Sequence, residues 1–163
     1  DDDTFKRKTR KIISVLAGEA SAAFSVAHGQ PAAFDARVCV LPNEKLVVDY
    51  FRWRHEDAHR NALNAHCYWM LRKKGKSVSR ATGLTRGLTR GQKHDLLFEN
   101  GINFNELPAW QKRGFGVYFQ TALKEGFNPQ TGETVQAERP ILQTDFELPL
   151  GDDYSAFVSE RIV

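Results

Sequence analysis

Apolar residues recur at helical spacing in the first part of the chain, from Ile12 to Phe24. The pattern predicts a helix from residue 4 to about residue 27. Asp3 or Thr4 is suited to cap its start, and Gly29-Gln30-Pro31 is expected to end it.

A short apolar run over residues 34–41, ended by Pro42, predicts a buried strand. Asn43 is expected to cap a second, long helix that reaches about Lys74, with Gly75 as its stop. The apolar residues of this helix do not form one stripe, which indicates that successive turns face different neighbours.

The second half of the chain predicts shorter elements. They are a short helix from Val78, a loop over 83–91, a helix over 92–98, strands over 115–123 and 134–148 joined by a turn at 128–132, and a last helix over 154–160. The elements follow the order α-β-α-α-β-β-α, which predicts an α+β fold built in layers.

Composition describes a soluble globular protein. The chain has 163 residues, 41% of them hydrophobic and 26% charged, which is the size of one domain. No apolar run approaches the roughly 18 residues that span a bilayer, so we expect no membrane association. Cys39 and Cys67 stand among apolar neighbours, which predicts buried free thiols in a reducing, cytoplasmic environment. The chain begins at Asp1 without a methionine, and we expect it to be a fragment.

Charge is segregated along the chain. Five of the six residues over 6–11 are basic, and no acid lies between Asp57 and Asp95, an interval rich in lysine and arginine. Clustered cations suit a polyanionic partner, because they release its counterions on binding, although a solvated basic face is an equal alternative. The repeat Gly-Leu-Thr-Arg over 83–90 could wrap a phosphate, but a flexible duplicated loop is the favoured interpretation.

The segment His55-Glu56-Asp57-Ala58-His59 matches the H-E-x-x-H pattern of zinc hydrolases. Two histidines four residues apart share one helix face and can both bind zinc. Arg54 and Arg60 put charges where a zinc helix is buried. Ala65 stands where the third histidine belongs, and His66 lies one residue too far. A zinc hydrolase is therefore the less favoured hypothesis.

Other polar segments form a set of motifs in a fixed order. They are Phe34-Asp35-x-Arg37, Trp53-Arg54-x-x-Asp57-x-His59-x-Asn61, Lys93-x-Asp95-Leu96-Leu97-Phe98, and Ile102-Asn103-Phe104-Asn105-Glu106-Leu107-Pro108 with Arg113-Gly114. Together they resemble the tRNA-His guanylyltransferase family over about residues 4–150. The hairpin segment over 126–133 is more similar to the relatives that repair truncated tRNAs than to the eukaryotic guanylyltransferases.

The resemblance implies a palm-like core of the polymerase and nucleotidyl-cyclase type. Residues 1–150 would form its C-terminal part, including a β-hairpin at 115–148, and residues 151–163 a C-terminal helix. It also implies 3′-to-5′ addition of nucleotides to tRNA. The 5′ end of the tRNA is activated with ATP, or already carries a triphosphate, and the 3′-hydroxyl of an incoming GTP or other nucleoside triphosphate attacks it, assisted by Mg²⁺. Members of the family form tetramers, so a homo-oligomer is expected.

The sequence departs from the family pattern in its metal ligands. The family's metal carboxylates lie on an Asp-Gly segment and a Ser-Asp-Glu strand upstream of the helix that begins near Thr4, and neither motif is present. We therefore expect the chain to supply triphosphate- and tRNA-binding groups without Mg²⁺ ligands, and to be inactive alone. A degenerate RNA-binding module without catalysis is the alternative.

The expected site residues fall into three groups. Asp57, His59 and Lys93 are expected to be catalytic, with His59 neutralising or protonating a departing phosphate. The expected nucleotide-binding residues are Lys8, Lys11, Arg37, Asn61 and Asn103, and the expected tRNA-binding residues are Arg72, Lys73, Lys74, Arg86 and Arg90.

Four of these residues have a structural alternative. These are a solvated basic turn for Lys8 and Lys11, a surface ion pair with Asp35 or another acid for Arg37, and a hydrogen-bonded interior side chain for His59. His55 and His66 are predicted to be structural, and Trp53, Tyr68 and Trp69 to be core residues.

Overall fold

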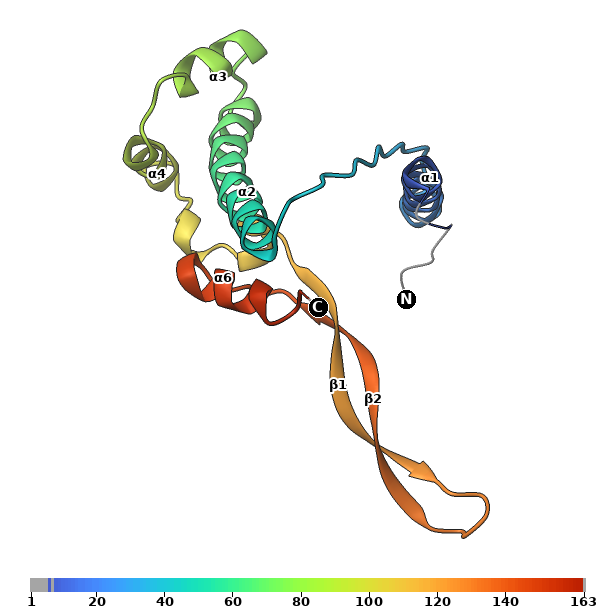
Figure 1. Cartoon of the computed structure of the whole chain (residues 1–163). Helices are drawn as coiled ribbons and strands as arrows, with labels where there is room; N and C mark the ends of the chain where they lie inside the picture. The colour runs from blue at the N-terminus through green and yellow to red at the C-terminus, as the bar shows by residue number, and fades with distance from the viewer. Residues whose placement is uncertain (1–5, 7, 163) are drawn as a thin grey trace. The chain divides into compact units, whose positions relative to one another are not determined.

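A helix of 30 residues, α2 (Glu44–Lys73), is the longest element of the computed structural model, which describes Lys6 and residues 8–162 (Figure 1). The side chain of Asn43 accepts a hydrogen bond from the Leu46 amide (3.0 Å), which satisfies one free N–H of the first turn. Gly75 follows the helix at φ 82°, a conformation that glycine adopts without strain. The predicted cap and stop of this helix are both confirmed.

The chain divides into two units, Asp1–Pro42 and Asn43–Val163. The first unit contains α1 (Thr9–His28), which ends at Gly29 in the left-handed conformation. The segment after it folds back along the helix, because the Ser25 hydroxyl accepts from the Ala32 amide (2.9 Å) and the Phe24 and Phe34 rings meet at 5.4 Å.

Three predictions for this unit are wrong: the start of its helix, the strand over 34–41 and the burial of Cys39. Lys8 has extended backbone and α1 begins at Thr9, so the predicted start at residue 4 is too early; the proposed caps Asp3 and Thr4 lie outside the described residues. The predicted strand over 34–41 is irregular, because no described segment pairs with it. Cys39 within this segment is exposed, although it is free as expected.

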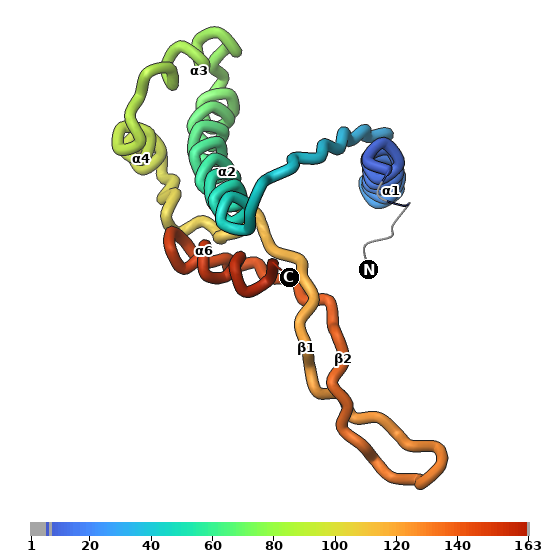
Figure 2. The backbone as a smooth tube through the Cα atoms, viewed as in Figure 1, coloured from blue at the N-terminus to red at the C-terminus, as the bar shows by residue number. Residues whose placement is uncertain are grey.

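The second unit places short helices against α2 (Figures 1 and 2). They are α3 (Val78–Thr85), α4 (Arg90–Phe98), the 3₁₀ turn η2 (Phe104–Glu106), α5 (Ala109–Arg113) and α6 (Gly151–Ser159). The predicted helices at 78, 92–98 and 154–160 are confirmed within a few residues. The predicted loop over 83–91 is shorter, since helices occupy both of its ends.

The core forms on one face of the second half of α2. Leu63, Cys67 and Met70 repeat at the spacing of one helix face and pack against Leu97 and Phe104. Phe104 is 1% exposed and therefore anchors η2 against α2. A second cluster of Leu148, Tyr154 and Val158 holds α6. Trp53 and Trp69 are exposed, which corrects their prediction as core residues; Tyr68 is half-buried against the core.

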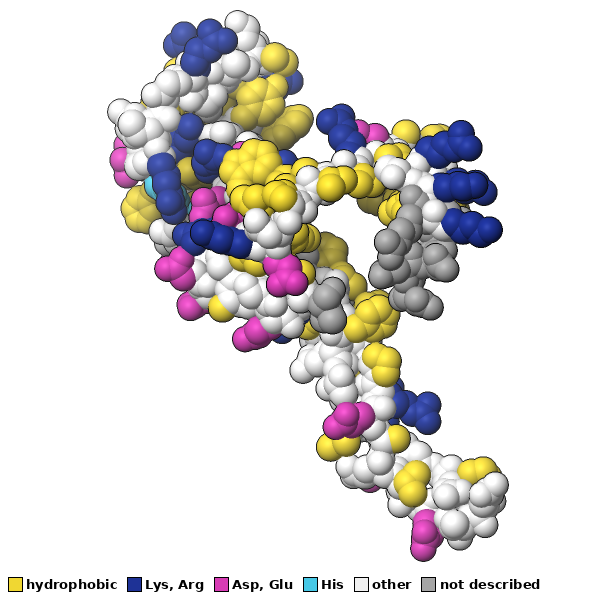
Figure 3. Space-filling view, viewed as in Figure 1, with side chains coloured by type: hydrophobic (Ala, Val, Ile, Leu, Met, Phe, Trp, Pro, Cys, Tyr) yellow, Lys and Arg dark blue, Asp and Glu magenta, His cyan; other side chains and the backbone are white. Residues whose placement is uncertain are grey.

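The strands β1 (Gly116–Phe127) and β2 (Thr134–Asp145) form an antiparallel hairpin that extends away from these helices (Figure 1). Apolar side chains along it are exposed (Figure 3). At its base the Arg161 guanidinium stacks 3.7 Å from the Phe157 ring and 4.4 Å from the Tyr118 ring. The hairpin confirms the two predicted strands and the α+β class.

The described helices do not stack on this hairpin as a layer, so the expected layered order is wrong for this part of the chain. The palm-like core stays a prediction. None of the helices formed by the described residues is both long and apolar enough to cross a membrane.

Candidate functional site

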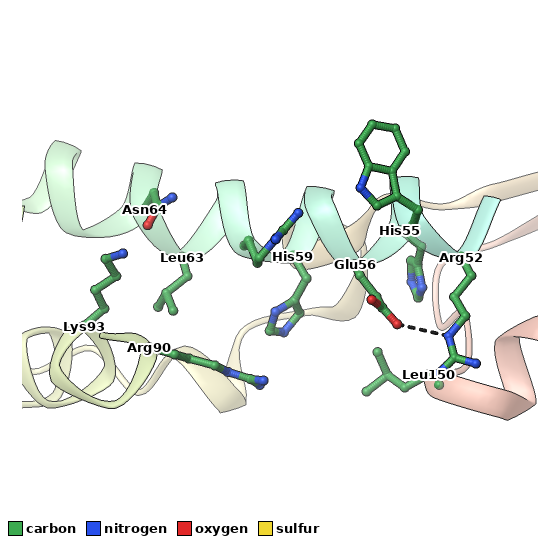
Figure 4. A pocket seen from close by; sticks show the side chains of 12 residues that line it. Arg52, His55, Glu56, His59, Leu63, Asn64, Arg90, Lys93 and Leu150 are labelled. Carbon is green, nitrogen blue, oxygen red and sulfur yellow. Dashed lines mark hydrogen bonds and ion pairs between the residues drawn. The ribbon is translucent and has the colours of Figure 1, made fainter. Parts of the chain in front are cut away.

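A cavity of about 610 Å³ opens between α2, α4 and the start of α6 (Figure 4). Its lining comes from three stretches of the second unit: Arg52, Trp53, His55, Glu56, His59, Arg60, Leu63 and Asn64 of α2, Arg90 and Lys93 of α4, and Leu150 and Gly151. The volume is in the range of pockets that bind small molecules, and the lining mixes apolar and charged groups as such pockets do.

Helix α4 supplies two of the cations. Its N-terminus is fixed by a capping box, in which the Thr89 hydroxyl accepts from the Gln92 amide and the Gln92 side chain accepts from the Thr89 amide. Arg90 and Lys93 then lie one turn apart. Figure 4 shows the Lys93 side chain extending toward α2 and the Arg90 side chain extending along the cavity to the space below His59. Neither has a carboxylate within 4.0 Å in the described part of the chain. Their charges are thus available to an anionic ligand.

The opposite end of the cavity is neutralised by acids. Arg52 binds Glu56 at 3.1 Å and Asp152 at 2.7 Å. Arg60 is held by Asp57 at 2.9 Å. The unpaired positive charge of the cavity is therefore concentrated on the α4 side.

His59 lies opposite Arg90 (Figure 4). Its ring meets the edge of Phe104 at 5.5 Å, and His66 and His94 contact the same ring at 5.4 Å each. Burial, and then the charge of Arg90, lowers the pKa of His59 below its ordinary value of 6.5. The structure thus brings two of the three predicted catalytic residues, His59 and Lys93, to one cavity.

His55 lines the same cavity one helical turn before His59. It is 5% exposed, and its ring stacks on that of Tyr154 at 3.9 Å. Its Nε2 atom is buried without a hydrogen-bond partner among the described residues. Burial, followed by the charge of Arg113, lowers the pKa of His55 to about 4. The sequence interpretation treated His55 as structural and missed its place in the site, although the four-residue spacing to His59 puts both on one face.

Asp57 and Asn61 are neighbours that do not line the cavity. The Asp57 carboxylate accepts from Arg60 at 2.9 Å and from the Asn61 amide at 3.0 Å, and Arg54 lies 4.0 Å away. Through Arg60 the pair borders the cavity. The catalytic role of Asp57 and the nucleotide-binding role of Asn61 remain predictions.

Asn103 uses its side chain locally. Its Oδ1 accepts from the Asn105 amide at 3.2 Å and its Nδ2 donates to Glu106 at 2.8 Å, which caps η2. It is not part of the cavity lining. Its predicted contact with a nucleotide would therefore require these bonds to be shared or broken.

The predicted tRNA-binding residues divide between two places. Arg72, Lys73 and Lys74 lie at the C-terminal end of α2, where the Lys74 amine binds the Asn100 side chain, and Arg86 follows α3. Arg90 instead lines the cavity. Figure 3 shows lysine and arginine side chains, in dark blue, over this helical part of the second unit.

The remaining predicted nucleotide-binding residues belong to the first unit. Lys8 precedes α1 and Lys11 lies in its first turn, both exposed. Arg37 binds Asp35 at 3.1 Å, and both side chains are exposed, which matches the surface ion pair given as its alternative. Their approach to a common phosphate site stays a prediction.

The described residues contain no group of three or more His, Cys, Asp or Glu side chains that could hold a metal ion. The expectation that magnesium ligands lie upstream stays a prediction.

Residues 45–145 match the family model described as "Thg1 C terminal domain". The chain is 29% identical over 168 residues to "tRNA(His) guanylyltransferase 2" of Arabidopsis thaliana, which covers 97% of this chain and 30% of that protein. It spans between 24% and 47% of the lengths of five such curated relatives.

Two solved structures share the fold. The tRNA(His) guanylyltransferase of Saccharomyces cerevisiae superposes with a TM-score of 0.61 at 24% identity, covering 88% of this chain and 60% of that one. A bacterial tRNA(His) guanylyltransferase-like protein in complex with ATP superposes with a TM-score of 0.57 at 25% identity, covering 96% of this chain and 58% of that one.

Proposed function

This chain belongs to the tRNA(His) guanylyltransferase family, and from that premise we propose that it takes part in adding nucleotides to the 5′ end of tRNA. Its contribution is the cavity between α2 and α4, which binds the phosphates of a nucleotide or of an activated tRNA 5′ end. The observation that carries the proposal is the pair Arg90 and Lys93, two cations without acid partners in the described chain, which line the same cavity as His59. That the bacterial relative was solved in complex with ATP supports a nucleotide as ligand.

The reaction is a phosphoryl transfer in the 3′-to-5′ direction. The 3′-hydroxyl oxygen of the incoming nucleotide forms a bond to the phosphorus attached to the tRNA 5′ oxygen. The bond from that phosphorus to its leaving group breaks, and AMP or pyrophosphate departs with the electron pair while the hydroxyl proton passes to solvent. Positioning and charge neutralisation dominate such reactions.

Arg90 and Lys93 suit charge neutralisation, because charge-assisted hydrogen bonds to phosphate oxygens are about twice as strong as neutral ones. His59 is uncharged in the free protein at neutral pH, since burial and Arg90 disfavour its protonation. A polyanion bound between them offsets the cations and raises the pKa of His59. The ring can then carry a proton toward the departing phosphate.

The wider assignment extends the same proposal. The basic residues Arg72, Lys73, Lys74 and Arg86 hold the tRNA backbone, and Lys8, Lys11 and Arg37 of the first unit add phosphate contacts. Several points remain predictions from the family resemblance: the palm-like core, repair of truncated tRNA, the use of GTP and Mg²⁺, inactivity of this chain alone and a tetrameric state. The cytoplasmic location remains a prediction from the two cysteines.

Calorimetric titration with ATP and with inorganic tripolyphosphate tests the proposal. Replacing Lys93 with methionine keeps the aliphatic stem and removes the charge, and we expect a loss of affinity for both ligands of roughly 10- to 100-fold. Lys124→Met, on the exposed hairpin, is the matched control and is expected to bind as the wild type does. Equal affinities of the two variants would contradict the role of the cavity. Competition between ATP and 5′-triphosphorylated tRNA then tests whether the tRNA end enters the same site.

A further inference from the structure

The two ends of the cavity differ in chemistry. In Figure 4 the side chains of Arg90 and Lys93 lie at one end, against Leu63 and His59. At the other end Glu56 and Asp152 surround Arg52, two acids to one cation. Arg113 adds a positive charge near His55, but it does not line the cavity. Among the lining cations, those without a described acid partner are Arg90 and Lys93, so a polyphosphate is attracted more strongly to the α4 end than to the end where acids neutralise Arg52.

His55 stands at the end of the cavity away from Lys93, near Leu150 (Figure 4). Its ring is fixed by stacking on Tyr154 at 3.9 Å with 23° between the planes. Helix α6 carries Tyr154 and α2 carries His55, so two elements determine the orientation of the imidazole. This ring is therefore pre-organised before any ligand arrives.

None of the described residues uses the hydrogen-bonding capacity of the His55 Nε2 atom. Nε2 is buried and has no partner among the described residues, whereas Nδ1 of His66, about three turns further along the same helix, contacts the Ala62 carbonyl oxygen at 2.8 Å. A buried polar atom without a partner costs free energy, and such atoms are concentrated at functional sites. An uncharged imidazole pairs well with a hydroxyl or with the edge of a base, and gains little from a phosphate.

We propose that His55 contacts the nucleoside part of the ligand, a ribose hydroxyl or a base edge, and thereby fixes the direction in which a nucleotide lies in the cavity. The inference rests on the proposed function, since it assumes that phosphates bind against Arg90 and Lys93. The neutral state that burial imposes on His55 is consistent with this assignment. His55 acts here as a binding and orienting residue.

The test compares a nucleotide with its phosphate chain alone. His55→Phe keeps an aromatic ring against Tyr154 and removes Nε2. We expect it to weaken ATP binding about fivefold in calorimetry, while the affinity for inorganic tripolyphosphate stays as in the wild type. Lys93→Met is expected to weaken both ligands. His66→Phe, on the same helix but outside the cavity lining, is the matched control and is expected to change neither affinity.

Two outcomes would overturn the inference: an equal loss of ATP and tripolyphosphate affinity in His55→Phe, or no loss of either. A failure of the proposed function looks different, since the wild type would then bind neither ligand or Lys93→Met would bind both normally. If His55→Phe does not fold, nitrogen-15 NMR of the wild-type histidine rings decides. ATP is expected to shift the His55 signals and tripolyphosphate to leave them in place; equal responses to the two ligands would refute the assignment.

Discussion

The stability of the protein should fall between pH 7 and pH 5 because of His55. The pKa of His55 is lowered from its ordinary 6.5 to about 4 in the folded protein, chiefly by burial. In the unfolded chain the imidazole takes up a proton as the pH falls through 6.5, whereas the folded protein stays unprotonated until about pH 4. The unfolded state therefore binds more protons throughout this interval, and the free energy of unfolding decreases as the pH decreases.

The magnitude follows from these two pKa values. Near pH 7 both states are mostly neutral, so the residue contributes almost no pH dependence there. At pH 5 nearly all unfolded molecules carry the proton and few folded ones do, which removes about 2 kcal/mol of stability relative to pH 7. Below pH 4 the folded state is protonated too, and the dependence on this residue levels off.

Urea unfolding followed by tryptophan fluorescence at several pH values measures this effect. His55→Gln has no titrating group at this position, so its free energy of unfolding should decline by about 2 kcal/mol less than that of the wild type between pH 7 and pH 5. Other histidines and the carboxylates titrate in both proteins and cancel in the comparison. His28→Gln, at an exposed position of the first unit, is the control and should follow the wild type. The reasoning is refuted if the wild type and His55→Gln lose the same free energy over this range.

Three further substitutions have expected outcomes. Phe104→Ala removes a ring that is 1% exposed and should lower the free energy of unfolding by about 3–5 kcal/mol in urea titration; a loss below about 1 kcal/mol would show that the site collapses around it. Asn43→Ala removes the cap of α2 and should lower the free energy of unfolding by about 1 kcal/mol in thermal unfolding, while Asn43→Gly should stay closer to the wild type. If Asn43→Ala is as stable as the wild type, the side chain of Asn43 does not stabilise α2. Replacing Lys73 and Lys74 together with alanine should reduce the slope of log affinity for tRNA against log salt by roughly one to two; an unchanged slope would mean that this helix end makes no phosphate contact.

Local chemistry explains which elements could be predicted. The start of α2 at Asn43 depends on a hydrogen bond from a residue three positions away, and its end depends on Gly75, so both are written in neighbouring residues. The hairpin over β1 and β2 follows from alternation and a turn signal, which are equally local. The strand expected over 34–41 failed because a strand requires hydrogen bonds to a neighbour, and no described segment pairs with it.

The candidate site was predicted only in part, because local motifs mark some of its residues whereas others depend on contacts between distant parts of the chain. His59 and Lys93 could be singled out by the resemblance of their motifs to a known family, and the structure brings both to one cavity. His55 could not, because its role depends on Tyr154, about a hundred residues away in sequence, which fixes and buries its ring. Arg37 also belongs to a motif that resembles the family. In the structure, however, it forms an ion pair with Asp35, two residues before it.

The sequence by itself determined the family, the cap of α2, the hairpin and the identity of the charged groups, because each depends on residues close together in the chain or on their order. Only the tertiary structure decided which of those charges lack partners and which ring is held neutral. A charge is neutralised, and a side chain is desolvated, by whatever lies next to it in space, and packing of α4 and α6 against α2 is what places those neighbours.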